Sequence, residues 1–194
     1  MNYTSEYITE EPDAVVPHVR ICVGAVQVTG RSTLTRLEKE SYMINCTFEL
    51  NNKAMSTFKC GATSFSAFSG LGKHVNSRLS ACIPNQGPIP PGTYYIFDRQ
   101  SGGLFGSLRD LFNDRDEWFA LYAIDSKIDD ATYCNEVKRG NFRLHPKGIR
   151  GISQGCITLD SKADYLFLRT ILKKSKQEAV PGSELLAYGK VVVK

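Results

Sequence analysis

Phe142–Leu159, with the sequence FRLHPKGIRGISQGCITL, places His145 eleven residues before Cys156, on either side of a segment rich in Gly and Ser. A histidine and a cysteine brought together by a tight loop are the minimum parts of a thiol nucleophile with its base. Gly155 directly precedes the cysteine, where it lets the backbone turn sharply and lets a substrate carbonyl approach a backbone N–H group. The stretch therefore predicts a cysteine nucleophile at the end of a tight loop.

The first residues of this stretch have the alternation of a strand, in which side chains two apart share a face. We expect Phe142 and Leu144 to face the core. Arg143 and His145 would then face the other way, into a cleft. Pro146 ends the strand because it has no N–H group for the ladder. His145 thus lies where a rigid strand gives way to a loop, a common position for reactive side chains.

The predicted chemistry assigns one role to each polar residue of the stretch. A protonated His145 would stabilise the thiolate of Cys156, whose unperturbed pKa is about 8.5, and would then protonate a leaving amine. The N–H groups of Gly155 and Cys156 are candidates for an oxyanion hole. Arg143 is predicted to hold a substrate carboxylate. Ser153 is predicted to hydrogen-bond either within the loop or to the substrate.

The rest of the chain indicates one mainly β (α+β) domain with one main helix. Asn51-Asn52-Lys53 is predicted to be a hairpin turn, and the Ser- and Gly-rich residues 64–76 a loop. Asp160 or Ser161 is predicted to cap a helix that runs to about Lys174, with apolar residues at 163, 166, 167 and 171 in helical spacing. Alternating, β-branched or aromatic runs predict strands over 43–50, 54–60, 93–98, 118–125, 141–145, 156–159 and 185–193.

Length and composition bound the class of protein. The 194 residues suit one domain, and 42% apolar with 23% charged residues exclude a disordered chain. We divide the chain into an N-terminal extension over residues 1–42 (an arm, a possible strand and a short helix) and a catalytic domain over 43–194. The net charge of +4 is too small to imply nucleic acid as a partner. The acidic N-terminus lacks a signal peptide, so we expect synthesis in the cytoplasm and export by another route.

The six cysteines lie at positions 22, 46, 60, 82, 134 and 156, without a CxxC pair or a zinc spacing. With Cys156 as the nucleophile, at most two disulfides and one spare thiol can form, and buried reduced thiols are the alternative. A metal site would need third and fourth ligands that no recognised spacing supplies. We therefore expect no metal and no cofactor.

Other side chains have both a structural and a functional interpretation. Trp118 and Tyr122 share a strand face and serve either core packing or substrate stacking. Asp98 and Asp125 end strands, so they either stabilise turns or orient His145.

These residues resemble a known signature. His145 followed by Ser153-Gln154-Gly155-Cys156-Ile157 resembles the His and Ser/Thr-x-Gly-Cys pattern of L,D-transpeptidases with a YkuD-type catalytic domain. Gly87–Tyr95 is similar to that family's Pro-x-Gly-x-Tyr/Phe segment. With the loop Phe68–Asn76, the pattern resembles a divergent branch more closely, the L,D-transpeptidase-like effectors of type VI secretion systems. Gln154 and Thr158 depart from the common family pattern, and the His-to-Cys spacing is shorter.

The resemblance covers roughly residues 43–194 and implies a YkuD-like β-sandwich or barrel. It implies that Cys156 attacks the L-centre carbonyl of diaminopimelate in a tetrapeptide stem of peptidoglycan and releases terminal D-Ala, while His145 moves protons. Water would then give L,D-carboxypeptidase activity, and a D-amino acid would give exchange. Ser69 and Asn76 are implied to bind substrate.

The resemblance also implies an antibacterial toxin that a secretion system delivers to the periplasm of a target bacterium. Its expected partners are peptidoglycan stems, a cognate immunity protein and a component of the delivery system. Two other classes stay open: a cytoplasmic cysteine amidase or hydrolase, and a non-catalytic module that binds the cell wall.

Overall fold

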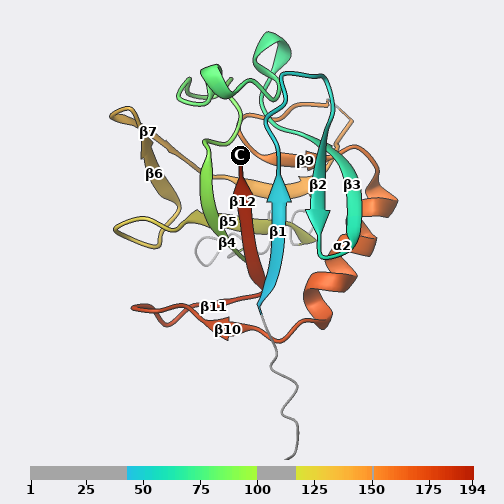
Figure 1. Cartoon of the computed structure of the whole chain (residues 1–194), viewed down its shortest axis with the longest axis vertical. Helices are drawn as coiled ribbons and strands as arrows, with labels where there is room; N and C mark the ends of the chain where they lie inside the picture. Colours follow the sequence, from blue (N-terminus) through green and yellow to red (C-terminus); the bar gives the residue numbers. More distant parts are fainter. Residues whose placement is uncertain (1–42, 100–116, 150) are drawn as a thin grey trace, which may run out of the picture. The chain divides into compact units, whose positions relative to one another are not determined.

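The computed structural model describes residues 43–99, 117–149 and 151–194, so the predicted N-terminal extension lies outside the described residues. In the described part, eight strands form a closed barrel, confirming a mainly β fold. These strands are β1 (Ile44–Phe48), β2 (Ser56–Cys60), β3 (Thr63–Phe68), β4 (Gly92–Asp98), β5 (Phe119–Ala123), β8 (Arg143–Pro146), β9 (Ile157–Leu159) and β12 (Gly189–Val193). Around the barrel their order is β1-β12-β4-β5-β8-β9-β3-β2 (Figure 1).

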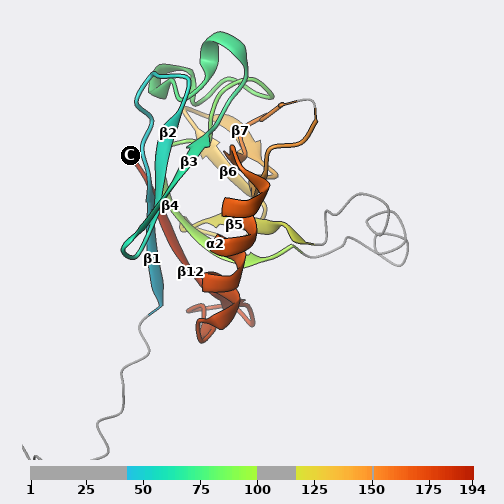
Figure 2. The ribbon, with the colours of Figure 1, turned by 90° about the vertical axis from the view of Figure 1, so that its right-hand side faces the viewer.

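Smaller elements flank the barrel. One hairpin pairs β6 (Ala131–Cys134) with β7 (Val137–Gly140), and another pairs β10 (Glu178–Ala179) with β11 (Leu186–Ala187). Two short 3-10 helices, η1 (Gly72–His74) and η2 (Arg78–Ser80), lie in the connection between β3 and β4. The predicted helix is α2 (Lys162–Lys174), and Figures 1 and 2 show it lying along one side of the barrel.

The predicted strands are confirmed where their pattern is local, and two predictions are wrong. Residues 64–68 were expected in a loop but belong to β3, because Phe65 and Ala67 point into the core while Ser64 and Ser66 face outward. The strand expected over 185–193 is broken into β11 and β12. At Gly189 a Cβ atom would lie 2.4 Å from the carbonyl oxygen of Ile44, so glycine lets β12 approach β1 closely.

The predicted cap of α2 is confirmed, but the predicted apolar face is wrong. The side-chain oxygen of Ser161 accepts a hydrogen bond from the Asp164 N–H group, the expected geometry of an N-cap. The buried side chains of the helix are Tyr165, Leu168 and Leu172, whereas Leu166 is 41% exposed and Phe167 55% exposed. Tyr165 can be buried because its hydroxyl donates to the Glu117 carbonyl oxygen, which leaves no unsatisfied polar atom.

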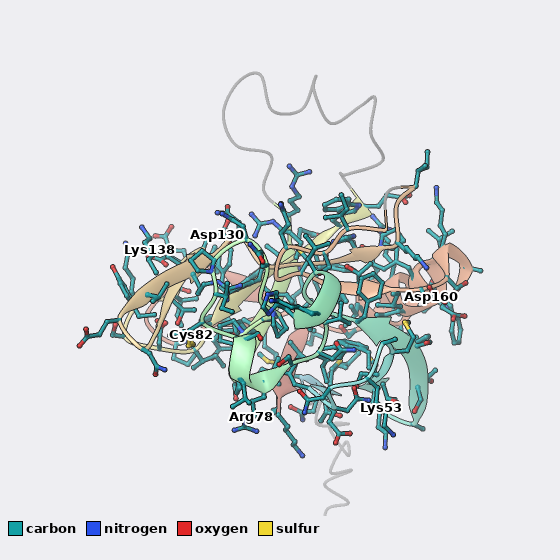
Figure 3. All side chains as sticks on the ribbon, turned by 90° about the horizontal axis from the view of Figure 1, so that it is seen from above. Lys53, Arg78, Cys82, Asp130, Lys138 and Asp160 are labelled. Atoms are coloured by element: carbon teal, nitrogen blue, oxygen red, sulfur yellow. A yellow bond between two sulfur atoms is a disulfide. The ribbon has the colours of Figure 1, made fainter. Side chains whose placement is uncertain are left out.

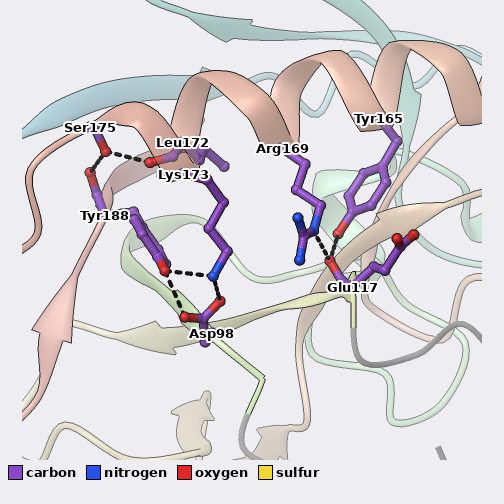
Figure 4. A network of polar contacts seen from close by, with 8 residues as sticks. All are labelled: Asp98, Glu117, Tyr165, Arg169, Leu172, Lys173, Ser175 and Tyr188. Atoms are coloured by element: carbon purple, nitrogen blue, oxygen red, sulfur yellow. Dashed lines mark hydrogen bonds and ion pairs between the residues drawn. The ribbon is translucent and has the colours of Figure 1, made fainter. Parts of the chain in front are cut away.

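A polar network ties α2 to the barrel (Figure 4). The Lys173 ammonium lies 2.6 Å from an Asp98 carboxylate oxygen and 2.7 Å from the Tyr188 hydroxyl, which itself donates to Asp98. Towards the other end of the helix, Arg169 donates to the Glu117 carbonyl oxygen beside Tyr165. Polar contacts thus hold the helix at both ends of its buried face. The buried side chains of the helix belong to the same core cluster as the inner side chains of β8 and β9.

The assignment of the buried face gives a matched test. Leu168→Ala should lower the free energy of unfolding by about 2–5 kcal/mol, because it leaves a cavity in the core. Leu166→Ala should cost only about 0.5 kcal/mol, because this side chain is largely exposed. Urea unfolding of both variants measures the difference, and equal losses would contradict the assignment.

Candidate active site

The parallel pairing of β8 with β9 determines the surroundings of the predicted base, His145. The register opposes Leu144 to Ile157 and His145 to Thr158. Leu144 and Ile157 point into the core, so His145 and Thr158 point to the other face. Cys156 directly precedes β9, two residues before Thr158. The structure therefore places the predicted nucleophile at the start of the strand that pairs with the strand of His145.

Hydrogen bonds determine which nitrogen of His145 can act as a base. Nδ1 lies 2.8 Å from the Pro146 carbonyl oxygen, which can only accept, so Nδ1 carries the proton of the neutral ring. Nε2 is then an acceptor, and it lies 3.3 Å from the Thr158 hydroxyl. The ring is buried, with 6% of its surface exposed. Nε2 is thus the nitrogen that can take a proton, and Thr158, which the sequence did not single out for the site, helps to hold it.

Trp118 stacks on His145, with the ring centroids 4.2 Å apart and the planes 16° from parallel. The indole fixes the imidazole plane, and its π face favours the charged ring once His145 is protonated. Tyr122 packs against Phe97 at 5.1 Å on the outer face of β4 and β5, and it interacts electrostatically with Arg143 and Asp130. Trp118 therefore contacts the predicted base directly, and the stacking role of Tyr122 stays a prediction.

The surroundings of Cys156 shift the pKa of its thiol. Burial raises its pKa above the ordinary value; the N–H group and guanidinium of Arg143 lower it, while Asp130 raises it. The thiol also donates to the Asn141 carbonyl oxygen at 3.8 Å. Burial thus opposes the thiolate expected from the sequence, whereas Arg143 favours it.

The turn before Cys156 is tightly packed. Gly155 has a φ of 107°, and a Cβ atom there would lie 2.9 Å from a terminal nitrogen of Arg139 and 3.1 Å from the Phe142 ring. A side chain at this position would be strained as well as crowded. Ser153 donates to the Cys156 carbonyl oxygen at 2.6 Å and accepts from the Gly70 N–H group. Ser153 therefore hydrogen-bonds within the structure of the turn, as one of its two predicted roles required.

Ser69 and Asn76, which the sequence assigned to substrate binding, are fully buried. The Ser69 side chain accepts from the Ile89 N–H group, and Asn76 accepts from the Ser69 N–H group and donates to the Lys53 carbonyl oxygen. These bonds shape the loop that presents Gly70 to Ser153. Both residues thus support the turn from behind, and their contact with a substrate remains a prediction.

Arg143 is already paired in the structure. Its two terminal nitrogens lie 2.7 and 2.5 Å from the two carboxylate oxygens of Asp130, a bidentate ion pair. The aspartates that were candidates for orienting His145 bond elsewhere: Asp98 to α2, and Asp125 to the Lys127 N–H group and the Thr132 hydroxyl.

A cavity of about 600 Å³ has Asn141 in its wall, the residue whose carbonyl oxygen accepts from the Cys156 thiol. The wall has both signs of charge and also includes Gln154, two residues before Cys156. Figure 3 shows Asp130, Lys138 and Cys82 on the side of the β6–β7 hairpin, and Asp160 on the opposite side. The lining residues are Pro84, Asn85, Asp129, Asp130, Ala131, Lys138, Arg139, Gly140, Asn141 and Gln154.

Arg139 joins two walls of this cavity, and sequence reasoning missed it. Its guanidinium is buried, stacks 5.6 Å from the Phe142 ring, and donates to the carbonyl oxygens of Ala81, Gly87 and Pro88. Burial lowers its pKa. The disulfide Cys82–Cys134 links the same two regions covalently. Nothing in the local pattern marks Arg139, because its partners are carbonyl groups more than 50 positions away.

Two searches of the described residues bear on other functions. No group of three or more His, Cys, Asp and Glu side chains there is placed to hold a metal ion. Within the same residues, no helix is long and apolar enough to span a membrane.

Residues 63–183, well over half of the chain, match the Tlde1 domain, so the chain belongs to this family of type VI secretion effectors. Membership implies an immunity protein and a delivery machinery as partners, as the sequence suggested. No match was found among curated proteins or among solved structures.

The resting state of Cys156 can be tested by alkylation with iodoacetamide between pH 6 and pH 11. Because burial raises the pKa, we expect the midpoint of the rate profile to lie above the ordinary thiol value of about 8.5. Mass spectrometry of the Cys156 peptide measures the rate. A midpoint below neutrality would show a preformed thiolate and contradict this assignment.

The role of Thr158 can be tested with two substitutions. Thr158→Val removes the hydroxyl that holds Nε2, so alkylation of Cys156 at neutral pH should slow several-fold. Thr158→Ser keeps the hydroxyl and should retain the rate. Equal rates in both variants would mean that Thr158 only fills space.

Proposed function

We propose that this effector is a cysteine-dependent L,D-transpeptidase and L,D-carboxypeptidase of YkuD type that acts on tetrapeptide stems of peptidoglycan. The observation that supports the proposal is the β8–β9 register, which opposes His145 to Thr158, two residues after Cys156 and its glycine turn. Membership of an effector family supports a toxic role.

In the first half-reaction the Cys156 sulfur attacks the carbonyl carbon of the L-centre of diaminopimelate. Because burial raises the pKa of the thiol, its proton passes during attack to the base, Nε2 of His145. The carbonyl oxygen becomes an oxyanion, and the N–H groups of Gly155 and Cys156 are its candidate donors. The carbon–nitrogen bond to D-Ala then breaks, His145 returns the proton to the amine, and a thioester remains on Cys156.

In the second half-reaction an acceptor resolves the thioester. Water yields a tripeptide stem and regenerates the thiol, which is L,D-carboxypeptidase activity. The amine of a D-amino acid yields an exchanged stem, and the amine of a neighbouring stem yields a cross-link. His145 takes the acceptor's proton and returns one to the sulfur, so each route balances.

The charged cavity suits this substrate, because a peptide stem carries both carboxylates and amines. Lys138 and Asp129 offer the opposite charges on the cavity wall. A stem carboxylate would replace the carboxylate of Asp130 on Arg143, since the guanidinium group already binds a carboxylate there. Trimmed or exchanged stems can no longer serve as ordinary cross-link donors, which would weaken a rival's wall.

The proposal predicts a specific change in stem masses. Purified protein is incubated with peptidoglycan rich in tetrapeptide stems, with and without an added D-amino acid, and the muropeptides are analysed by mass spectrometry. Wild type should convert tetrapeptides to tripeptides or exchange their terminal D-Ala. Cys156→Ala should lose at least about a hundredfold of this activity, because it removes the nucleophile.

Cys60→Ala is the matched control, because it removes a buried thiol far from β8 in the barrel order and should retain activity. Toxicity on directing the protein to the periplasm, lost with Cys156→Ala, would separate this proposal from a cytoplasmic amidase. Unchanged stem masses, with binding to cell walls that survives Cys156→Ala, would instead establish a non-catalytic wall-binding module.

A further inference from the structure

Cys46 and Cys60 face each other across the first hairpin of the barrel. They are direct partners in the antiparallel register of β1 and β2. The Gly61 N–H group donates to the Asn45 carbonyl oxygen, which makes Asn45 and Gly61 a hydrogen-bonded pair. Because such pairs alternate along an antiparallel ladder, Cys46 and Cys60 form a non-hydrogen-bonded pair. In these pairs the two side chains are closest.

The two thiols meet inside the barrel. Cys46 is 1% exposed and Cys60 3% exposed, and both point to the core side of their strands. The interaction with Cys60, together with burial, raises the pKa of Cys46. Opposed Cα atoms in such a pair are about 4.5 Å apart, within the range of roughly 4.4–6.8 Å that a disulfide needs.

The same chain already contains one disulfide, between Cys82 and Cys134, 52 positions apart. A structural disulfide forms and persists only in oxidising surroundings. Conditions that join two cysteines so distant in sequence also suffice for two that a short hairpin holds opposite each other. The remaining described thiol, Cys156, has no such cross-strand cysteine partner in the described register.

We propose that Cys46 and Cys60 are a redox modification site that forms a second disulfide in oxidising surroundings. Among the described cysteines, Cys156 is then the one that stays a free thiol. Two S–H bonds break and one S–S bond forms. Two electrons and two protons pass to a disulfide oxidant such as oxidised glutathione, which becomes two reduced thiols. Because the folded barrel buries both sulfurs, the exchange takes place before the barrel closes. The proposal is independent of the chemistry of Cys156.

The test is oxidative refolding of the full chain. Reduced, unfolded protein is refolded in a buffer of reduced and oxidised glutathione, alkylated with iodoacetamide, and digested without reduction. Mass spectrometry should find one peptide pair linked through Cys46 and Cys60, another through Cys82 and Cys134, and alkylated Cys156. The second link is the internal control for oxidation. Alkylated Cys46 and Cys60 beside an intact Cys82–Cys134 link would overturn the proposal.

A variant isolates the new link. In Cys82→Ala/Cys134→Ala, reductant should still lower the midpoint of thermal unfolding by several degrees, because closing the loop between residues 46 and 60 restricts the unfolded chain. Adding Cys46→Ala and Cys60→Ala should abolish this dependence on reductant. If the first variant does not fold, the peptide map of wild type decides alone. A midpoint that reductant does not change in the folded first variant would also overturn the proposal.

Discussion

The parallel ladder between β8 and β9 is the constraint on which the site depends. Pairing Leu144 with Ile157 fixes which side chains enter the core, and parity then assigns His145 and Thr158 to the opposite face. A slip of one residue would bury polar side chains and expose apolar ones, so core packing and site geometry are specified together. The burial of Leu144 and Ile157 thus determines the direction in which the side chain of His145 points.

Around this ladder, buried polar groups take the place of apolar packing. Ser69 and Asn76 shape one loop, Ser153 joins it to the turn, and Arg139 joins the turn to the segment that contains Cys82. Nearly all of these bonds end on backbone groups. Such a fully satisfied network holds a backbone conformation more specifically than apolar contacts do. It also explains why several residues that resemble substrate ligands in sequence are buried in the structure.

Much of the fold could be predicted from sequence because its signals are local. The strands around Tyr95 and Leu121, the turn at Asn51 and the cap at Ser161 each depend on neighbours within a few positions. The errors arise where the structure of a segment is determined by contacts with residues far away in the sequence. The buried face of α2 depends on a carbonyl group at Glu117, and β3 depends on pairing that covers Phe65.

The same distinction holds at the site. The prediction that Cys156 works with His145 comes from one short stretch, whereas the contacts of Trp118, Thr158 and Arg139 depend on strands brought together by the barrel. The tautomer of His145 has a kinetic consequence for the proposed chemistry. With Nδ1 bound to a carbonyl oxygen, every proton must enter and leave through Nε2. The departing amine and the incoming acceptor must then occupy the same position beside Nε2, one after the other. Turnover would therefore follow a ping-pong scheme, in which released D-Ala competes with water for the acyl-enzyme.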